Sequence, residues 1–175
     1  ERCYVHHLDD PRCGEINAKL WEVLNSWKAS GVSFRGNIMI GEYFNVSTFS
    51  SMTIPFTRIM AHDLPLYWRA GVRHIDYMHV ITQQWGAHAL TNCQFAAQTW
   101  DHQCDVTAWL QQFFRQRYGN VAECMQSFYR SLEEALRHCK PLRHYVGKKA
   151  NGPVTSPREP LPGYTTTGLN DTLPH

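Results

Sequence analysis

The apolar run at residues 37–43 is the feature that most constrains the fold of this chain. Its apolar side chains are largely continuous rather than alternating, which is typical of a strand covered on both faces, as in parallel sheets. Residues 2–6 and 74–80 are predicted to form two further short strands. Helical segments separate these strands, so the order is strand, helix, strand, short helix, strand. This alternation predicts a parallel α/β sheet with right-handed crossovers.

The two helices of this first half are predicted from different signals. The first covers about residues 14–28, where five apolar residues recur on one helical face: Ile16, Leu20, Val23, Leu24 and Trp27. The second is predicted to begin after Asp63, which can cap a helix with Pro65 just inside it, and to end at Gly71. Asp63 is therefore expected at a helix N-terminus.

The second half of the chain is predicted to be helical. One helix spans residues 86–100, and a second begins at the capping residue Asp105 and ends at Gly119. A third begins at Asn120, with Glu123 three residues later as in a capping box. Their apolar stripes are typical of packing faces.

After Pro141 the composition changes. Proline, glycine and threonine are frequent and apolar periodicity is lost, so residues 141–175 are predicted to be a flexible tail. The chain then divides into residues 1–85 with the strands, a helical region over 86–140, and the tail. Three parallel strands would leave long apolar edges exposed, which natural domains avoid. We therefore expect the sheet to be completed by strands from elsewhere.

Composition narrows the function class. With 43% hydrophobic and 18% charged residues the chain is globular, and a formal charge of +2 without charged blocks predicts neither a nucleic-acid nor a membrane partner. The six cysteines form no CxxC pair, and no HExxH spacing occurs. No glycine-rich phosphate loop is present either. We expect no metal site and no cofactor.

Ligands of parallel sheets bind at the carboxyl ends of the strands and in the loops that follow. This rule, applied to the predicted strands, selects Glu42 and Asp63 as candidate catalytic residues. It also selects a set of candidate substrate-binding residues: His6, His7, Tyr43, Asn45, His62, His79 and Trp85.

Glu42 is the strongest of these candidates because its carboxylate follows an apolar strand and a glycine. A carboxylate near a buried position needs partners or a chemical task. The alternative is a buried ion pair with Arg73 or Arg58. Asp63 has helix capping as its alternative. Trp85 fits a stacking platform for a sugar ring and core packing equally well.

Several segments together resemble a known family over about residues 2–140. They are Tyr4-Val5-His6-His7, Asp10-Pro11-Arg12-Cys13 with Asn17, Gly41-Glu42-Tyr43-Phe44-Asn45, Ile54-Pro55-Phe56-Thr57, Met60-Ala61-His62-Asp63-Leu64-Pro65, Gly71-Val72-Arg73-His74, Tyr77-Met78-His79-Val80, Trp85-Gly86, Leu90-Thr91-Asn92, Arg117-Tyr118-Gly119 and Phe128-Tyr129. The likeness is to the domain of unknown function 4838 family, which is linked to glycoside hydrolases and to endo-β-N-acetylglucosaminidases.

The resemblance implies the C-terminal part of a (β/α)8 barrel, with about three parallel strands followed by a helical region. It implies a glycan substrate, hydrolysis between two carboxylic acids, and Glu42 as the nucleophile or base. The isolated chain is expected to be inactive, because the missing N-terminal part of its own barrel would carry the second acid. The compartment of the protein cannot be read from targeting signals, and the resemblance implies a secreted or periplasmic parent protein.

Two other functions remain open at this point. The chain could be a non-catalytic carbohydrate-binding domain that keeps an aromatic cleft without an acid pair. It could instead be a helical interaction module built from residues 86–140. Exposure of Trp85 and the surroundings of Glu42 distinguish these functions.

Overall fold

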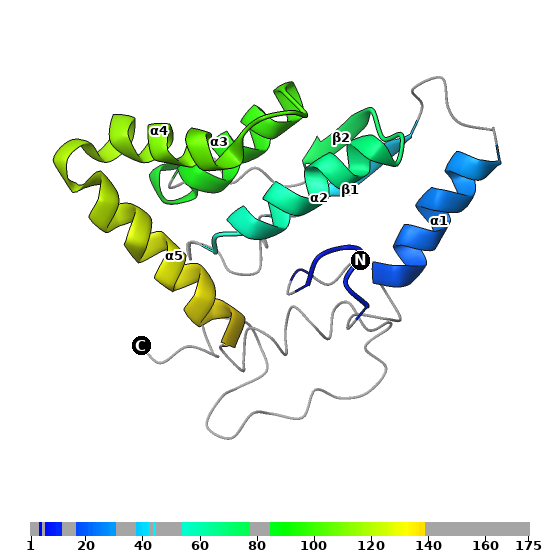
Figure 1. Cartoon of the computed structure of the whole chain (residues 1–175), viewed down its shortest axis with the longest axis horizontal. Helices are drawn as coiled ribbons and strands as arrows, with labels where there is room; N and C mark the ends of the chain where they lie inside the picture. Colours follow the sequence, from blue (N-terminus) through cyan, green and yellow to red (C-terminus); the bar gives the residue numbers. More distant parts are fainter. Residues whose placement is uncertain are drawn as a thin grey trace.

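The computed structural model of the chain describes residues 4, 6–11, 17–30, 38–42, 44, 54–77 and 85–138. Its elements follow one another as α1 (Asn17–Ala29), β1 (Met39–Glu42), α2 (Thr57–Arg69), β2 (His74–Tyr77), α3 (Trp85–Trp100), α4 (Val106–Tyr118), the 3₁₀ helix η3 (Gly119–Val121) and α5 (Ala122–His138). In Figure 1, α2 and the two strands lie in the middle, with α1 on one side and α3, α4 and α5 on the other.

β1 and β2 form a parallel two-stranded sheet, with α2 as the connection between them. Both strands lie within residue ranges where strands were predicted, β1 within 37–43 and β2 within 74–80. Met39 lies opposite His74, and Glu42 lies opposite Tyr77 at the carboxyl ends. The register therefore places a carboxylate and a phenol together where the sheet ends.

The prediction of a (β/α)8 barrel portion with about three parallel strands is wrong. Helices account for 72% of the described residues, and the sheet among them has two strands. Of the predicted strand 2–6 only Tyr4 and His6 are described, and both lie in bends outside the sheet. The Asn17 side chain donates hydrogen bonds to the carbonyls of His6 and His7. A side chain therefore bonds backbone groups that a neighbouring strand would otherwise use.

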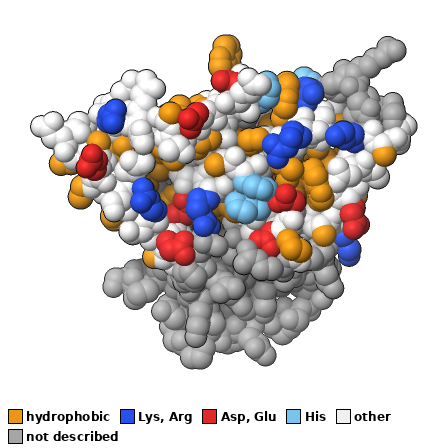
Figure 2. Space-filling view, in the orientation of Figure 1, with side chains coloured by type: hydrophobic (Ala, Val, Ile, Leu, Met, Phe, Trp, Pro, Cys, Tyr) orange, Lys and Arg blue, Asp and Glu red, His pale blue; other side chains and the backbone are white. Residues whose placement is uncertain are grey.

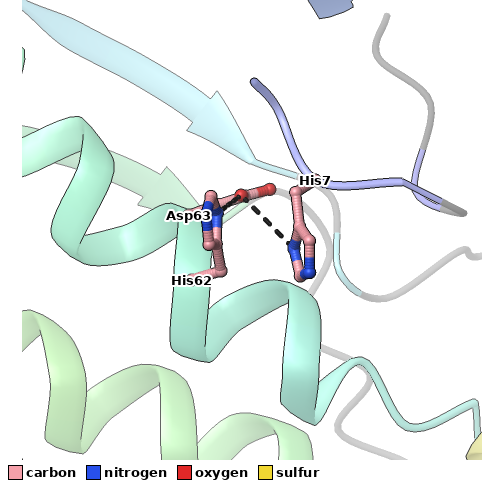
Figure 3. A group of neighbouring side chains, drawn as sticks. All are labelled: His7, His62 and Asp63. Atoms are coloured by element: carbon pink, nitrogen blue, oxygen red, sulfur yellow. Dashed lines mark hydrogen bonds and ion pairs between the residues drawn. The ribbon is translucent and has the colours of Figure 1, made fainter. Parts of the chain in front are cut away.

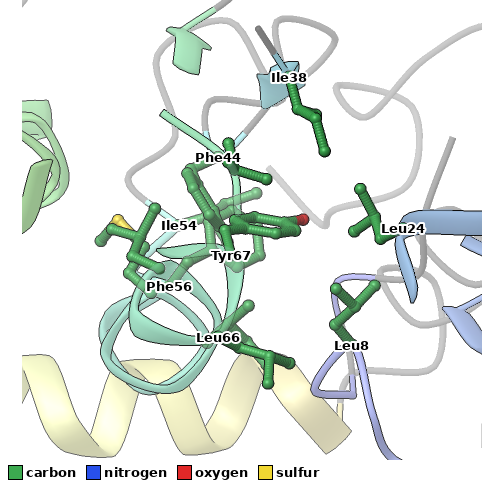
Figure 4. Packing of buried hydrophobic residues seen from close by; sticks show 12 residues of the cluster. Leu8, Leu24, Ile38, Phe44, Ile54, Phe56, Leu66 and Tyr67 are labelled. Atoms are coloured by element: carbon green, nitrogen blue, oxygen red, sulfur yellow. The ribbon is translucent and has the colours of Figure 1, made fainter. Parts of the chain in front are cut away.

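The main hydrophobic core lies between α2, β1, α1 and the 6–11 segment (Figure 4). α2 dominates it with a set of buried apolar residues: Ile59, Met60, Leu64, Leu66 and Tyr67. Leu8 and Leu24 complete the core from the 6–11 segment and from α1, and both are buried. Burying each leucine side chain contributes about 1.5–3 kcal/mol. This core holds the carboxyl end of β1 against α2 and the 6–11 segment.

The apolar stripe predicted for the first helix is only partly buried. Leu24 is in the core, whereas Val23 is 41% exposed and Trp27 50% exposed. Ile16 lies outside the described residues. Periodicity identified the helix, but how much of its stripe is covered depends on which elements pack against it.

The predicted start of the second helix is also wrong. α2 begins at Thr57, so Asp63 lies inside the helix, as does Pro65. A proline in a helix interior costs about 3 kcal/mol because its ring removes one backbone hydrogen bond. The buried face of α2 offsets this cost. Gly71 is left-handed with φ +97° and follows the end of the helix, as expected.

The N-terminus of α2 is capped by a side chain from α5. Phe56 at the N-cap position makes no side-chain cap bond. Glu133 of α5 accepts a hydrogen bond from the Arg58 backbone N–H at 3.1 Å and another from the Thr57 hydroxyl. Negative charge at a helix N-terminus also interacts favourably with the helix dipole. A carboxylate from a distant part of the chain thus determines where α2 begins.

α3, α4 and α5 pack around a second, smaller core that contains Leu90, Phe114 and Ala122. Helices were expected at 86–100, after Asp105 and after Asn120, and these expectations are confirmed apart from small boundary shifts. The predicted tail at 141–175 lies outside the described residues. No helix in the described part of the chain is long and apolar enough to cross a membrane.

Asp105→Ala is expected to destabilise the protein by about 1 kcal/mol, because Asp105 caps α4 by accepting the Ala108 backbone N–H at 3.1 Å. Urea unfolding should show a lower midpoint with an unchanged slope. Thr107→Ala, an exposed change within α4, is the control and should leave the midpoint nearly unchanged. Equal midpoints for Asp105→Ala and the wild type would contradict the capping role.

Candidate functional site

Glu42 is completely buried at the carboxyl end of β1. The Tyr4 hydroxyl donates a hydrogen bond to its Oε2 atom at 2.9 Å. The Tyr67 hydroxyl, from α2, donates to Oε1. Hydrogen bonds to an ionised group are stronger than those between neutral groups. Two phenols from separate elements therefore hold this carboxylate in one orientation.

Tyr77 lies opposite Glu42 in the sheet, and its ring stacks on Phe95 of α3 at a centroid distance of 4.5 Å. Burial raises the pKa of Tyr77, and the nearby Glu42 charge raises it further. The hydroxyl therefore stays protonated at neutral pH. The Tyr77 hydroxyl is buried without a hydrogen-bond partner. A group that can both donate and accept a hydrogen bond therefore lies unpaired close to Glu42.

The ion pair expected as the alternative role of Glu42 does not involve the two predicted arginines. Arg58 lies 3.9 Å from Glu133 of α5. Arg73 donates to the carbonyls of Trp68 and Val72 and covers the Trp68 ring. Both guanidinium groups are thus engaged elsewhere, and tyrosines take the place expected for an arginine.

A second polar group lies one helical turn from Tyr67 on α2, where Asp63 meets the 6–11 segment (Figure 3). Asp63 is completely buried, and its Oδ1 atom accepts the Leu8 backbone N–H at 3.1 Å. The Nδ1 atoms of His62 and His7 lie 2.7 Å and 3.8 Å from the same oxygen. Asp63 therefore anchors the 6–11 segment to α2, instead of capping the helix as predicted.

The two imidazoles beside Asp63 are half-exposed and face each other, with ring centroids 4.2 Å apart. Burial lowers the pKa of His7, and the His62 ring lowers it further, against the opposite effect of Asp63. His7 is therefore neutral at pH 7 and has a lone pair on one ring nitrogen. Figure 2 shows histidine side chains grouped near the middle of this face of the molecule, beside acidic side chains.

α3 carries three further polar or aromatic residues on one side, at positions 85, 88 and 92. Trp85 is 49% exposed at the start of the helix. His88 and Asn92 are buried, with the His88 Nε2 atom and both Asn92 side-chain polar atoms unpartnered. Burial also lowers the pKa of His88. Buried polar atoms are normally hydrogen-bonded, so these three atoms are exceptions within the described structure.

A cavity of about 120 Å³ lies between α2, β2 and α3. Its lining includes Trp68, which stacks on His102 at 4.2 Å, and Arg73. None of the predicted site residues within the described part of the chain lines it. Tyr67, whose hydroxyl donates to Glu42, is one of the residues that line the cavity.

The structure brings some predicted site residues together and leaves others apart. His7, His62 and Asp63 form one cluster, and Glu42 is linked to them through α2. The described His6 lies in the same segment as His7, and Trp85 stands at the start of α3. Tyr43, Asn45 and His79 lie outside the described residues.

Sequence reasoning missed Tyr4, Tyr67 and Tyr77 around Glu42, and His88 and Asn92 on α3. Tyrosines at these positions look like ordinary core residues, because nothing local shows that their hydroxyl groups meet a carboxylate. If the start of α2 had been predicted at Thr57, Asp63 and Tyr67 would have been expected one turn apart on one helical face. That spacing was the only signal available.

Comparison of the chain with models of protein families, with curated proteins and with solved structures found no match.

Proposed function

We propose that this chain contributes Glu42 to a glycan-binding site of the glycoside hydrolase type. The observation that carries the proposal is the Glu42 carboxylate, buried at the end of a parallel strand and oriented by two tyrosine hydroxyls. Glycosidases cleave between two carboxyl groups whose orientation and separation determine the outcome. The resemblance to the domain of unknown function 4838 family, at Gly41-Glu42-Tyr43, supports the same assignment.

The contacts of Glu42 suggest how substrate would reach it. Oε1 is held by Tyr67, which is part of the core of α2. Oε2 is held by Tyr4, which is only half-buried and comes from the N-terminal segment. A sugar oxygen approaching Oε2 would take the place of the Tyr4 hydroxyl, while Tyr67 keeps the carboxylate in position. The unpartnered Tyr77 hydroxyl could then donate to the same ligand.

α3 supplies features suited to sugar recognition. An exposed indole such as Trp85 offers a flat apolar face on which a pyranose ring can stack. The unpartnered atoms of His88 and Asn92 lie on the same side of the helix and match the donors and acceptors of sugar hydroxyls. Polar groups of this kind fix orientation in sites that are otherwise apolar.

A second candidate function is carbohydrate binding without hydrolysis. It is favoured by the 49% exposed Trp85 and by the unpartnered polar atoms of His88 and Asn92 on α3. In that case Glu42 serves to hold Tyr4 and Tyr67, and binding rests on α3. The two candidates differ in whether bonds are broken, so one set of variants tests both.

The test measures binding and hydrolysis separately. Binding of N-acetylglucosamine oligosaccharides to this chain is measured by calorimetry. Hydrolysis of N-glycans is measured with the longest form of the protein that the organism makes. Glu42→Gln should retain binding and lower turnover about 10²–10⁴-fold, the range typical of a lost general acid or base. Trp85→Ala should weaken binding several-fold.

The outcomes separate the candidates. Unchanged turnover in Glu42→Gln removes Glu42 from the chemistry. Glycan binding without any hydrolysis by the wild-type protein favours the second candidate. Failure of the wild-type protein to bind or cleave any glycan overturns both. Val23→Ala, an exposed apolar change on α1, is the control for Trp85→Ala and should leave binding unchanged.

A further inference from the structure

His7, His62 and Asp63 form a group of three potential metal ligands. Each offers one ligand atom, and these atoms lie within 4.8 Å of one another. They come from two segments far apart in the sequence. The hydrogen bond from the Leu8 backbone N–H to the Asp63 carboxylate holds those segments together. The group is therefore held by the fold and does not depend on the position of an exposed side chain.

The distances suit a single small ion after minor adjustment. Ligands about 2.0–2.2 Å from a tetrahedral zinc ion lie roughly 3.3–3.5 Å apart. The two imidazole nitrogens lie 2.7 Å and 3.8 Å from Asp63 Oδ1, on either side of that value. Both histidines are half-exposed, so their rings have room for the changes that these distances require, roughly 0.3–0.8 Å. An ion would take the place of the proton shared between His62 and Asp63.

The partners of the three residues support a prepared site. Asp63 is completely buried, and its Oδ1 atom lies against both imidazoles and accepts one backbone N–H. The His7 Nδ1 atom is buried without a hydrogen-bond partner. On the far side of the His62 ring, Nε2 lies 3.4 Å from the Asp9 carboxylate. Metal-binding histidines usually have a carboxylate or carbonyl on their other nitrogen, which fixes the tautomer.

We propose that His7, His62 and Asp63 bind one divalent transition-metal ion, with Asp9 orienting His62. Two imidazoles and one carboxylate suit zinc and its first-row neighbours, whereas calcium and magnesium take oxygen ligands only. Three protein ligands leave at least one coordination position for water or a ligand oxygen. The half-exposed imidazoles place that position toward solvent. This site is separate from Glu42 and does not depend on the glycan proposal.

The test uses the untagged chain, with Zn²⁺ or Co²⁺ alone as the probe. Calorimetry should show one Zn²⁺ site, and Co²⁺ should give visible absorption bands typical of a site with nitrogen and oxygen ligands. Ca²⁺ should not compete. Zinc should also raise the thermal midpoint, because a ligand that binds only the folded state stabilises it.

Three variants locate the site. His7→Ala and His62→Ala should abolish the cobalt bands, and both replace half-exposed side chains. Asp9→Asn should weaken zinc binding about 10–100-fold while keeping the site, as expected for loss of an orienting carboxylate. His74→Ala, an exposed histidine on β2, is the matched control and should bind zinc like the wild type.

The proposal is overturned if the wild-type chain binds no zinc. It is overturned equally if His7→Ala and His62→Ala bind as tightly as the wild type while circular dichroism shows them folded. Loss of binding in His74→Ala alone would move the site elsewhere and also contradict it. Glycan binding is measured on the same variants, and its retention would show that the two proposals stand separately.

Discussion

Glu133→Ala is expected to lower the free energy of unfolding by about 2–4 kcal/mol. Glu133 is buried and accepts hydrogen bonds from both the Arg58 N–H and the Thr57 hydroxyl at the start of α2. Hydrogen bonds to charged groups each contribute about 1.5–3 kcal/mol, and α2 has no cap of its own. Without the Glu133 carboxylate, the first turn of α2, the helix that carries Asp63 and Tyr67, loses both of these hydrogen bonds. Urea unfolding with an unchanged slope is the measurement.

Glu133→Gln separates hydrogen bonding from charge. The side-chain carbonyl of the amide can still accept one of the two hydrogen bonds. Glu133→Gln should therefore lower the free energy of unfolding by about half as much as Glu133→Ala. Ser131→Ala, at an exposed position of α5, is the control and should change stability by less than about 0.5 kcal/mol. A Glu133→Ala protein as stable as the Ser131→Ala control would show that α2 does not depend on this cap.

Tyr67→Phe is expected to cost about 2–3 kcal/mol, although it removes a single oxygen atom. The hydroxyl donates to a completely buried carboxylate, and Glu42 loses this donor without gaining contact with water. The ring itself stays in the core, so no large cavity forms. Chemical unfolding measures the loss.

Tyr118→Phe is the matched control, because its hydroxyl lies 3.4 Å from that of Tyr129 and makes only a weak bond. It should cost about 0.5 kcal/mol or less. In a Glu42→Gln background the cost of Tyr67→Phe should fall, since the group left behind is neutral. A double-mutant cycle measures this coupling, and additive losses would show that Tyr67 and Glu42 do not interact.

Local patterns predicted a large part of the helical structure. The helix at 86–100 and the Asp105 cap follow from signals within about 15 residues, and the structure confirms them. The run at 37–43 was predicted to form a strand covered on both faces, and this is wrong: Glu42 is completely buried at the end of β1, whereas Met39 in the same strand is 66% exposed. The confirmed helical features depend on the residues themselves and their immediate neighbours, because helical periodicity and capping are local.

Prediction failed where a distant residue supplied what a local pattern seemed to require. Asp63 and Pro65 look like a helix start, yet Glu133, 75 residues from Arg58, moves that start to Thr57. Residues 2–6 have the composition of a strand, yet side-chain hydrogen bonds hold the described part of this segment outside the sheet. The predicted barrel depended on that third strand and fails with it.

The sequence alone predicted strands in the runs that contain β1 and β2, and it predicted a carboxylate at the carboxyl end of the first of them. Only the tertiary structure decided which groups meet. It joined Glu42 to tyrosines 25 and 38 residues away, and it brought the backbone of Leu8 to Asp63, 55 residues along the chain. Side-chain type is a local property, whereas the partners of a buried charge are decided by how α2, the strands and the N-terminal segment pack. As a result α2 contributes to two polar clusters, with Tyr67 at the Glu42 carboxylate and with His62 and Asp63 in the histidine–aspartate group.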